Sequence, residues 1–352
     1  MTAKINAAES IRGLACLAVV FSHLAMSFFP FLHHFDPTET TDLNWVYQVH
    51  HLPLGFLYSG DAAVFVFFVL SGYVLSYAIL KNPEQFQSRL KNMMVKRYPR
   101  LMIPALTSCV IIWATLSIVD VDSRHVGLWL QAFAQQDFSF KAALYEGTIG
   151  AFLFSDSNIN WVLWTMSIEL IGSFVLFFLL VLYQWKHAAF WLGSVLVLVL
   201  AYMWRGQGFC MGIASFVIGI YIFLYAKQLS AWFAVLLLIL GLYLAGAHNT
   251  SQAYSWLYGL WGEHTYDYSN FLAGPIIVYS VLMSPLLSKG LDHPILVWLG
   301  KLSFSIYLMH LLVLTLVCIP LFNVFLKWQW SYSQSAICSG LLAILATLVV
   351  AD

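Results

Sequence analysis

Long apolar runs, separated by short polar segments, recur along the whole chain. The first of them reads AAESIRGLACLAVVFSHLAMSFF. A helix of about 20 residues crosses a membrane core of ~30 Å, so runs of this length predict transmembrane helices. The pattern therefore predicts an all-α, polytopic integral membrane protein, a bundle of about ten transmembrane helices. The ten runs are residues 8–29, 56–80, 101–119, 161–184, 188–204, 209–226, 231–247, 270–287, 295–319 and 334–350.

The composition supports this fold class. Of the 352 residues, 61% are hydrophobic and 9% are charged, and the mean hydropathy is +0.81. These values exclude a soluble domain of this size. The formal net charge is zero, which gives no sign of a nucleic-acid partner. We expect one membrane domain over residues 5–350, and we expect the first run to stay as a span because it lacks a small-x-small cleavage site.

The lysines and arginines lie mostly on one side of the predicted membrane. Twelve of the sixteen flank that side and four flank the other. By the positive-inside rule, this difference predicts that both termini are cytoplasmic. The twelve are Lys4, Arg12, Lys81, Arg89, Lys91, Lys96, Arg97, Arg100, Lys186, Lys227, Lys289 and Lys301, and the four are Arg124, Lys141, Arg205 and Lys327.

The longer connections lie on the opposite side, at residues 30–55, 120–160 and 248–269. They hold many of the acidic residues, and residues 125–136 are expected to form a short helix at the surface. Their tryptophans are interpreted as an interfacial belt. These are Trp45, Trp129, Trp256 and Trp261.

Neither the histidine doublets of these connections nor the cysteines predict a metal site. Adjacent histidines usually point apart, and no cysteine or helical H-E-x-x-H motif accompanies the doublets. All five cysteines fall in predicted helices, where we interpret them as small buried residues without disulfides. The doublets are His33–His34 and His50–His51, and the cysteines are Cys16, Cys109, Cys210, Cys318 and Cys338.

The first helix carries two ionisable residues, Arg12 and His23. Eleven residues make about three turns, so both side chains project from the same face, ~16 Å apart. Ionisable groups within a membrane are costly and usually face a bundle interior or a wet cavity. The pair is consistent with an arginine that binds an anionic donor and a histidine that acts as a base. The alternatives are a positive-inside anchor for Arg12 and a packing residue for His23.

A basic loop at residues 81–100 is expected before the third predicted helix, and it ends in KRYPR. Arg97 and Arg100 are three residues apart, about one turn, so two guanidinium groups can reach one phosphate ligand. Pro99 fits the first turn of the following helix. The alternative is a topological signal that also attracts anionic lipid.

Two further polar side chains are predicted to lie at the depth of His23. Glu169 lies ~18 Å from the inner membrane edge, whereas His23 and His310 both lie ~22 Å from it. His310 ends a polar stripe with Ser303 and Tyr307 on one helical face. Either Glu169 or His310 is expected to orient His23. The alternative for both residues is packing between helices, which is also our interpretation of Ser71, Gly72 and Ser76.

These features suit transfer of an acyl group from a coenzyme A thioester to an acceptor hydroxyl, with His23 as general base. The sequence has no G-x-S-x-G motif and no glycine-rich phosphate loop before a strand. Two other classes stay open. One is a transporter or lipid flippase that uses the same buried charges, although no inverted repeat is visible. The other is an assembly component without activity.

Five motifs resemble the acyltransferase family 3 of membrane proteins, in the family's order and over nearly the whole chain. They are R-G-L-A…V-V-F-S-H from Arg12 to His23, FFVLSGYVLS, the R-x-x-R of Arg97 and Arg100, WVLWTMSIEL around Glu169, and LGKLSFSIYLMH ending at His310. The resemblance implies O-acylation, most often O-acetylation, of extracytoplasmic or lipid-linked carbohydrate by cytoplasmic acyl-CoA. It implies that His23 is catalytic, that Arg12, Arg97 and Arg100 bind the donor, and, less directly, that Glu169 and His310 contribute.

The chain also departs from the family pattern. Phe65 stands where some members have an acidic residue. The C-terminal periplasmic hydrolase-like domain of some members is missing, so we expect the membrane domain to act alone or to hand the acyl group to a separate periplasmic transfer protein. We therefore predict a multi-pass O-acetyltransferase of a bacterial inner membrane. Its expected donor is acetyl-CoA or another acyl-CoA, its expected partners are membrane lipid and a carbohydrate or glycolipid acceptor, and no metal is expected.

Overall fold

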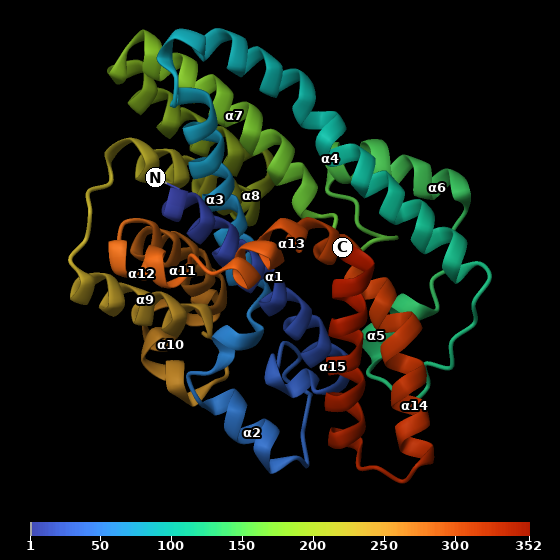
Figure 1. Cartoon of the computed structure of the whole chain (residues 1–352). Coiled ribbons are helices and arrows are strands. Elements are labelled where there is room, and N and C mark those ends of the chain that lie inside the picture. Colours follow the sequence, from blue (N-terminus) through green and yellow to red (C-terminus); the bar gives the residue numbers. More distant parts are fainter. Residues whose placement is uncertain (1) are drawn as a thin grey trace.

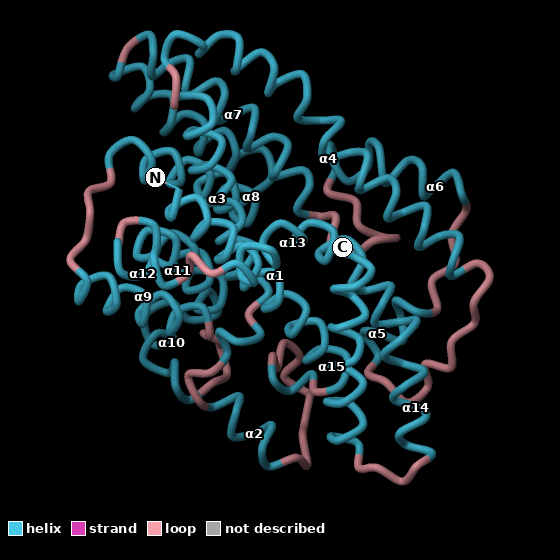
Figure 2. Tube along the Cα trace, in the orientation of Figure 1, coloured by secondary structure: helices cyan, strands magenta, loops and turns pink. Residues whose placement is uncertain are grey.

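The computed structural model describes residues 2–352, and the elements within this range are helices and loops without strands (Figure 2). This confirms the predicted all-α class. The α-helices are α1 (Thr2–Phe28), α2 (Asn44–His51), α3 (Gly60–Leu80), α4 (Phe86–Leu116), α5 (Leu128–Ala134), α6 (Phe140–Tyr145), α7 (Thr165–Trp185), α8 (His187–Tyr225), α9 (Ala231–Ala245), α10 (Ser255–Trp261), α11 (Thr265–Leu282), α12 (Pro285–Gly290), α13 (Pro294–Val313), α14 (Ile319–Lys327) and α15 (Tyr332–Ala351). Two π-helical segments, η4 (Glu146–Phe154) and η7 (Leu314–Cys318), follow α6 and α13.

Within the described residues, seven helical segments are long and apolar enough to span a membrane, which supports a multi-pass membrane protein. The predicted number of about ten is not confirmed. At 15 residues, ~22 Å, α9 is shorter than the membrane core. The seven segments are Lys4–Phe28, Gly60–Leu80, Pro83–Leu116, Thr165–Trp185, His187–Tyr225, Pro294–Lys327 and Tyr332–Ala351.

The long segment α8 folds back on itself at Gly206, whose φ of 78° and ψ of −166° interrupt the helix. Glycine tolerates this positive φ without a Cβ clash. The two halves lie side by side and run antiparallel. A hydrogen bond joins them, in which the hydroxyl of Tyr221 donates to Ser194 Oγ at 3.1 Å. One segment therefore contains both of the predicted helices 188–204 and 209–226.

The basic segment before residue 101 is a helix, where we expected a loop. Helix α4 runs without a break from Phe86 to Leu116, and Pro99 and Pro104 both lie inside it. Pro99 is therefore in mid-helix and not in a first turn. The continuous helix places Arg97 and Arg100 about one turn apart on a rigid element.

Helix α1 lies at the centre of the molecule, with α3 and α13 beside it (Figure 1). The backbones of α1 and α13 approach closely, since a Cβ on Gly13 would lie 2.7 Å from the backbone nitrogen of Gly300. One turn further along, Cys16 Sγ contacts the carbonyl oxygen of Ser303 at 3.1 Å. Both pairs are 287 residues apart in sequence, so the two helices run parallel in a fixed register.

The five cysteines are free, and Cys16, Cys109 and Cys318 are buried. Cys210 and Cys338 are half-buried. These side chains therefore fill space between helices, as their positions in apolar runs predicted.

Candidate active site

Two histidines meet where α1 and α13 continue past their glycine contact. His23 Nδ1 lies 2.6 Å from His310 Nε2. The ring planes differ by 6° and the centroids are 4.9 Å apart, as for two imidazoles joined edge to edge by a hydrogen bond. His310 is completely buried, whereas His23 is partly exposed. The two residues predicted to share one depth are therefore in direct contact, with the outer one accessible.

The hydrogen bonds define the protonation of this pair. His310 Nδ1 lies 3.1 Å from the carbonyl oxygen of Ile306, which can only accept. His310 Nδ1 therefore carries a hydrogen, and its neutral Nε2 accepts from Nδ1 of His23. This leaves His23 Nε2 with a free lone pair and without a hydrogen-bond partner among the described residues. A histidine oriented in this way through its other nitrogen is suited to act as a base.

An aromatic side chain covers His23 from the connection that follows α4. Trp129 on α5 stacks on His23, with centroids 4.9 Å apart and planes 19° apart. The N–H of Gly127 donates to the carbonyl oxygen of Ser27 at 2.7 Å, which fixes the start of α5 against the end of α1. Leu130 is completely buried. The expected surface helix therefore exists but has a buried face, and Trp129 belongs to the site instead of an interfacial belt.

Glu169 forms an ion pair with Arg97 and does not contact His23 through any hydrogen bond of the described residues. Its Oε2 lies 2.6 Å from Arg97 Nη2, and the side chains are each 13% exposed. Ser71 Oγ donates to Glu169 Oε1 at 2.9 Å, and Arg97 Nε donates to Ser173 Oγ at 2.7 Å. The carboxylate of Glu169 thus holds the guanidinium of Arg97. Of the two residues expected to orient His23, only His310 is hydrogen-bonded to it within the described residues.

Tyr307 lies between the histidine pair and this ion pair. Its hydroxyl donates to the carbonyl oxygen of Val162 at 2.9 Å and lies 3.1 Å from Thr165 Oγ1. Its ring centroid is 6.3 Å from that of His310. Thr165 precedes Glu169 by about one turn of α7, ~6 Å. Tyr307 therefore contacts α7 about one turn before Glu169, and among the described residues its hydroxyl bonds neither the histidines nor the Glu169–Arg97 pair.

The other two predicted donor-site arginines lie near Arg97. Arg12 Nη1 pairs with Glu9 at 3.1 Å and keeps 28% of its side chain exposed, and Arg100 is exposed on α4. Both are near enough to Arg97 for their charges to act on it. The three guanidinium groups therefore lie in one region of the molecule, which we call the arginine region.

The histidine doublets belong to a hydrogen-bonded cluster beyond the C-terminal end of α1, which no pattern in the sequence predicted. His33 Nδ1 lies 3.2 Å from His248 Nε2, and His50 Nε2 lies 3.0 Å from Thr250 Oγ1. Burial lowers the pKa of both His33 and His50 to about 4. Among the residues that the structure describes, no group of three or more His, Cys, Asp or Glu has the arrangement of a metal site.

A buried acid that our sequence reasoning missed shapes the loop in front of α7. The carboxylate of Glu146, 3% exposed, accepts from the backbone N–H groups of Asn158, Ile159 and Asn160 at 2.8–3.1 Å. Asn160 Nδ2 in turn donates to the carbonyl oxygen of Leu308 at 3.0 Å. Burial raises the pKa of Glu146, against the effect of these hydrogen bonds. No local motif marks this clamp, because its partners come from a loop and from α13.

A comparison with known protein families identifies the family of the chain. The acyltransferase 3 family model, described as an acyltransferase domain, matches residues 5–352. No curated protein and no solved structure matches the chain. The matched region includes both histidines, the three arginines and Glu169. The chain belongs to the acyltransferase 3 family and is a membrane acyltransferase.

Proposed function

We propose that this acyltransferase moves an acetyl group from cytoplasmic acetyl-CoA, or another acyl group from its CoA thioester, to a hydroxyl of an extracytoplasmic or lipid-linked carbohydrate. The observation that carries the proposal is the hydrogen-bond chain from Ile306 through His310 to His23. These hydrogen bonds leave one basic nitrogen of His23 free, with the arginine region about three turns of α1 away. We propose a bacterial inner membrane as its location, with both termini cytoplasmic.

His23 is the general base of the proposed transfer. Its Nε2 takes the proton of the acceptor hydroxyl as the oxygen attacks the thioester carbonyl carbon. The new C–O bond forms, the C–S bond breaks, and the thiolate leaves with the proton from His23 Nε2. The transfer yields an ester and a free thiol and needs no metal.

His310 is the positioning residue for this base. When His23 becomes an imidazolium, its Nδ1–H stays bonded to His310 Nε2, which stabilises the new charge and holds the ring in place. The Nδ1–H of His310 stays on the Ile306 carbonyl throughout. Because His310 is completely buried, water does not compete for this bond.

The arginine region binds the phosphates of the donor. Guanidinium groups make paired hydrogen bonds with phosphate oxygens. Glu169 and Ser173 hold Arg97 in one orientation, while the exposed Arg100 is free to follow the ligand. In this arrangement Glu169 supports donor binding and has no contact with the reacting atoms.

A transfer assay in nanodiscs tests the proposal. Purified protein receives acetyl-CoA labelled in the acetyl group, with membranes of the expression host as the source of carbohydrate acceptor. We expect label in the carbohydrate fraction for the wild type and for His187→Ala, an exposed histidine on α8. We expect no transfer by His23→Ala and a raised KM for Arg97→Ala. Transfer by folded His23→Ala at the wild-type rate would overturn the assignment of the base.

A further inference from the structure

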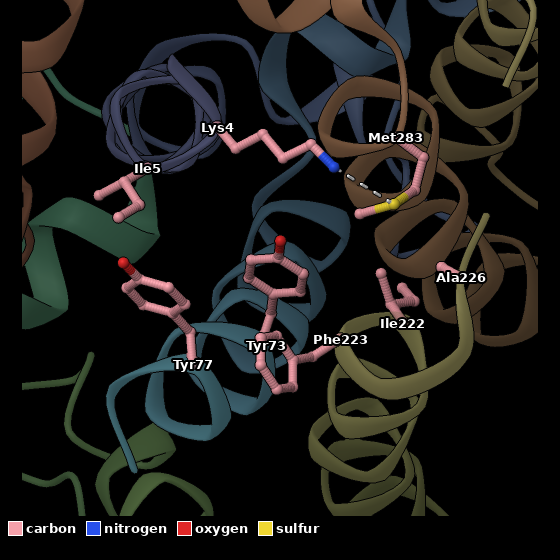
Figure 3. A pocket seen from close by; sticks show the side chains of 8 residues that line it. All are labelled: Lys4, Ile5, Tyr73, Tyr77, Ile222, Phe223, Ala226 and Met283. Carbon is pink, nitrogen blue, oxygen red and sulfur yellow. Dashed lines mark hydrogen bonds between the residues drawn. The ribbon is translucent and has the colours of Figure 1, made fainter. Parts of the chain in front are cut away.

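A cavity of about 370 Å³ lies at the end of the bundle where α1 begins (Figure 3). The beginning of α3 lies near the end of α1, since a Cβ on Gly60 would be 2.9 Å from Ser22 Oγ. The last turns of α3 are therefore beside the first turn of α1. The cavity is lined by Lys4, Ile5, Tyr73, Tyr77, Ile222, Phe223, Ala226 and Met283.

The polar side chains of this cavity can all donate hydrogen bonds, and among the described residues that line it no carboxylate accepts from them. Lys4 Nζ contacts the thioether sulfur of Met283 at 3.9 Å, a weak acceptor for an ammonium group. Within the described part of the chain, the hydroxyls of Tyr73 and Tyr77 have no hydrogen-bond partner. Figure 3 shows the hydroxyl of Tyr73 pointing toward the end of Lys4. Among the described residues that line the cavity, none is acidic.

The rest of the wall is apolar and fixed in place. The ring of Phe223 packs against the edges of both tyrosines, with centroids 5.6 Å and 6.3 Å apart. The backbone N–H of Leu229 donates to the carbonyl oxygen of Met283 at 2.9 Å, which ties the link after α8 to the end of α11. A ligand that satisfies both parts of the wall has a negatively charged head and a hydrocarbon portion.

We propose that this cavity binds the phosphate head of an anionic membrane phospholipid, with Lys4 as its counter-ion. Tyr73 donates to a phosphate oxygen, whereas the hydroxyl of Tyr77, which points toward Ile5 in Figure 3, donates to an ester oxygen of the same lipid. Ile222 and Phe223 contact the glycerol backbone and the first methylenes of the acyl chains. Basic pockets between transmembrane helices recognise lipid heads in this way. The size of the cavity suits a head group with the start of its chains. The lipid would tie α1, α3, α8 and α11 together at one end, whereas the acyl donor binds at the arginines of α1 and α4.

Native mass spectrometry of the delipidated full chain in detergent tests the proposal. The probes are dioleoyl phosphatidylglycerol and dioleoyl phosphatidylcholine, which share their tails and differ in net charge. The wild type should bind the anionic lipid about fivefold more tightly, the factor expected for one lysine near a phosphate. Lys4→Gln should remove this preference, and Tyr73→Phe, which deletes only a hydroxyl, should weaken it. The control Lys96→Gln, an exposed lysine of α4 outside the cavity, should retain it.

Three results would overturn the proposal. The first is equal affinity of the wild type for the two lipids, which would make the contact purely apolar. The second is an unchanged preference in Lys4→Gln. The third is displacement of the anionic lipid by inorganic phosphate or by coenzyme A, because the cavity would then take a soluble phosphate or part of the acyl donor.

Discussion

His23 Nδ1 and His310 Nε2 lie 2.6 Å apart, ten residues beyond the Gly13–Gly300 contact of the same two helices. The same spacing on both helices means that one parallel register sets both contacts. A close backbone approach at the glycines thus determines the position of two side chains about 15 Å further along. The candidate base depends on a helix pair as well as on its own residue type.

Removing His310 should lower kcat and leave KM for the acyl donor nearly unchanged, because His310 contacts His23 and not the arginines. For His310→Ala we expect a fall in kcat of about 10² or more, within the range of a positioned base. His310→Gln keeps an oxygen that can accept the Nδ1–H of His23, so it should recover part of the rate. A pH–rate profile should also shift for both variants. Equal losses in Ala and Gln with an unchanged profile would point to a packing role.

Separating α1 from α13 should break the histidine contact from a distance. In Gly13→Ala the new Cβ would meet Gly300 N at 2.7 Å and Leu299 Cγ at 2.9 Å. Such overpacking costs about 1–3 kcal/mol, and we expect a lower melting temperature together with a loss of transfer. Gly208→Ala is the matched control, since a Cβ there meets nothing within 4 Å. A fully active Gly13→Ala protein would show that the register tolerates this change.

The Arg97–Glu169 pair should behave as a coupled unit. Breaking a buried pair by removing one partner costs about 3–5 kcal/mol, because the other charge is left without compensation. Both side chains are 13% exposed, so we expect the lower part of this range for Glu169→Ala and for Arg97→Ala. The double variant should lose less than the sum of the two, measured by thermal unfolding in nanodiscs. Additive losses would mean that solvent already screens the pair.

The KM for the acyl donor should distinguish the role of Arg97 from that of Glu169. Arg97→Ala should raise KM for acyl-CoA more than Glu169→Gln does, because the glutamine still accepts from the guanidinium through its amide oxygen. Initial rates over a range of acyl-CoA concentrations measure both constants. A larger KM effect for Glu169→Gln would place Glu169 on the donor itself.

Acidification should destabilise the hydrogen-bonded cluster that contains His33 and His50. The pKa values of His33 and His50 are lowered to about 4, so between pH 6.5 and pH 4 the unfolded chain binds protons that the folded chain does not. Stability from these groups is therefore complete above pH 6.5 and falls toward pH 4, by up to about 1.4 kcal/mol per pH unit for each histidine. Melting temperatures in detergent at several pH values measure the slope, and His33→Asn should make it shallower. The exposed residue His187 supplies the control, since His187→Asn should leave the slope as it is.

Truncating Trp129 should expose His23 without removing the base. The aromatic contact is worth about 0.5–1.5 kcal/mol, so Trp129→Ala should reduce transfer several-fold and the melting temperature only slightly. Trp129→Phe keeps a ring over His23 and should stay closer to the wild type. Acetyl-CoA hydrolysis in the absence of acceptor is the second measurement, and it should rise in Trp129→Ala as water gains access. Unchanged transfer and hydrolysis would remove Trp129 from the site.

The helices could be predicted from the sequence because the length and polarity of each apolar run reflect the membrane and not a particular neighbour. The level of His23 and His310 along their helices followed from a constant rise per residue, and their contact in the structure agrees with it. Arg97 and Arg100 were correctly expected one turn apart, although the helix that carries them begins at Phe86 and not after Pro99.

The sequence by itself determined the helical class, the order of the helices and the polar residues on their faces. Only the tertiary structure decided which of these residues meet. Glu169 was expected near the level of His23 yet pairs with Arg97, because rise along a helix does not set its rotation or its neighbours. Trp129 lies on the short helix α5 and His248 lies in the loop after α9, and they take their positions from contacts with His23 of α1 and with His33. Such contacts depend on packing between segments far apart in the chain, which no local pattern of residues specifies.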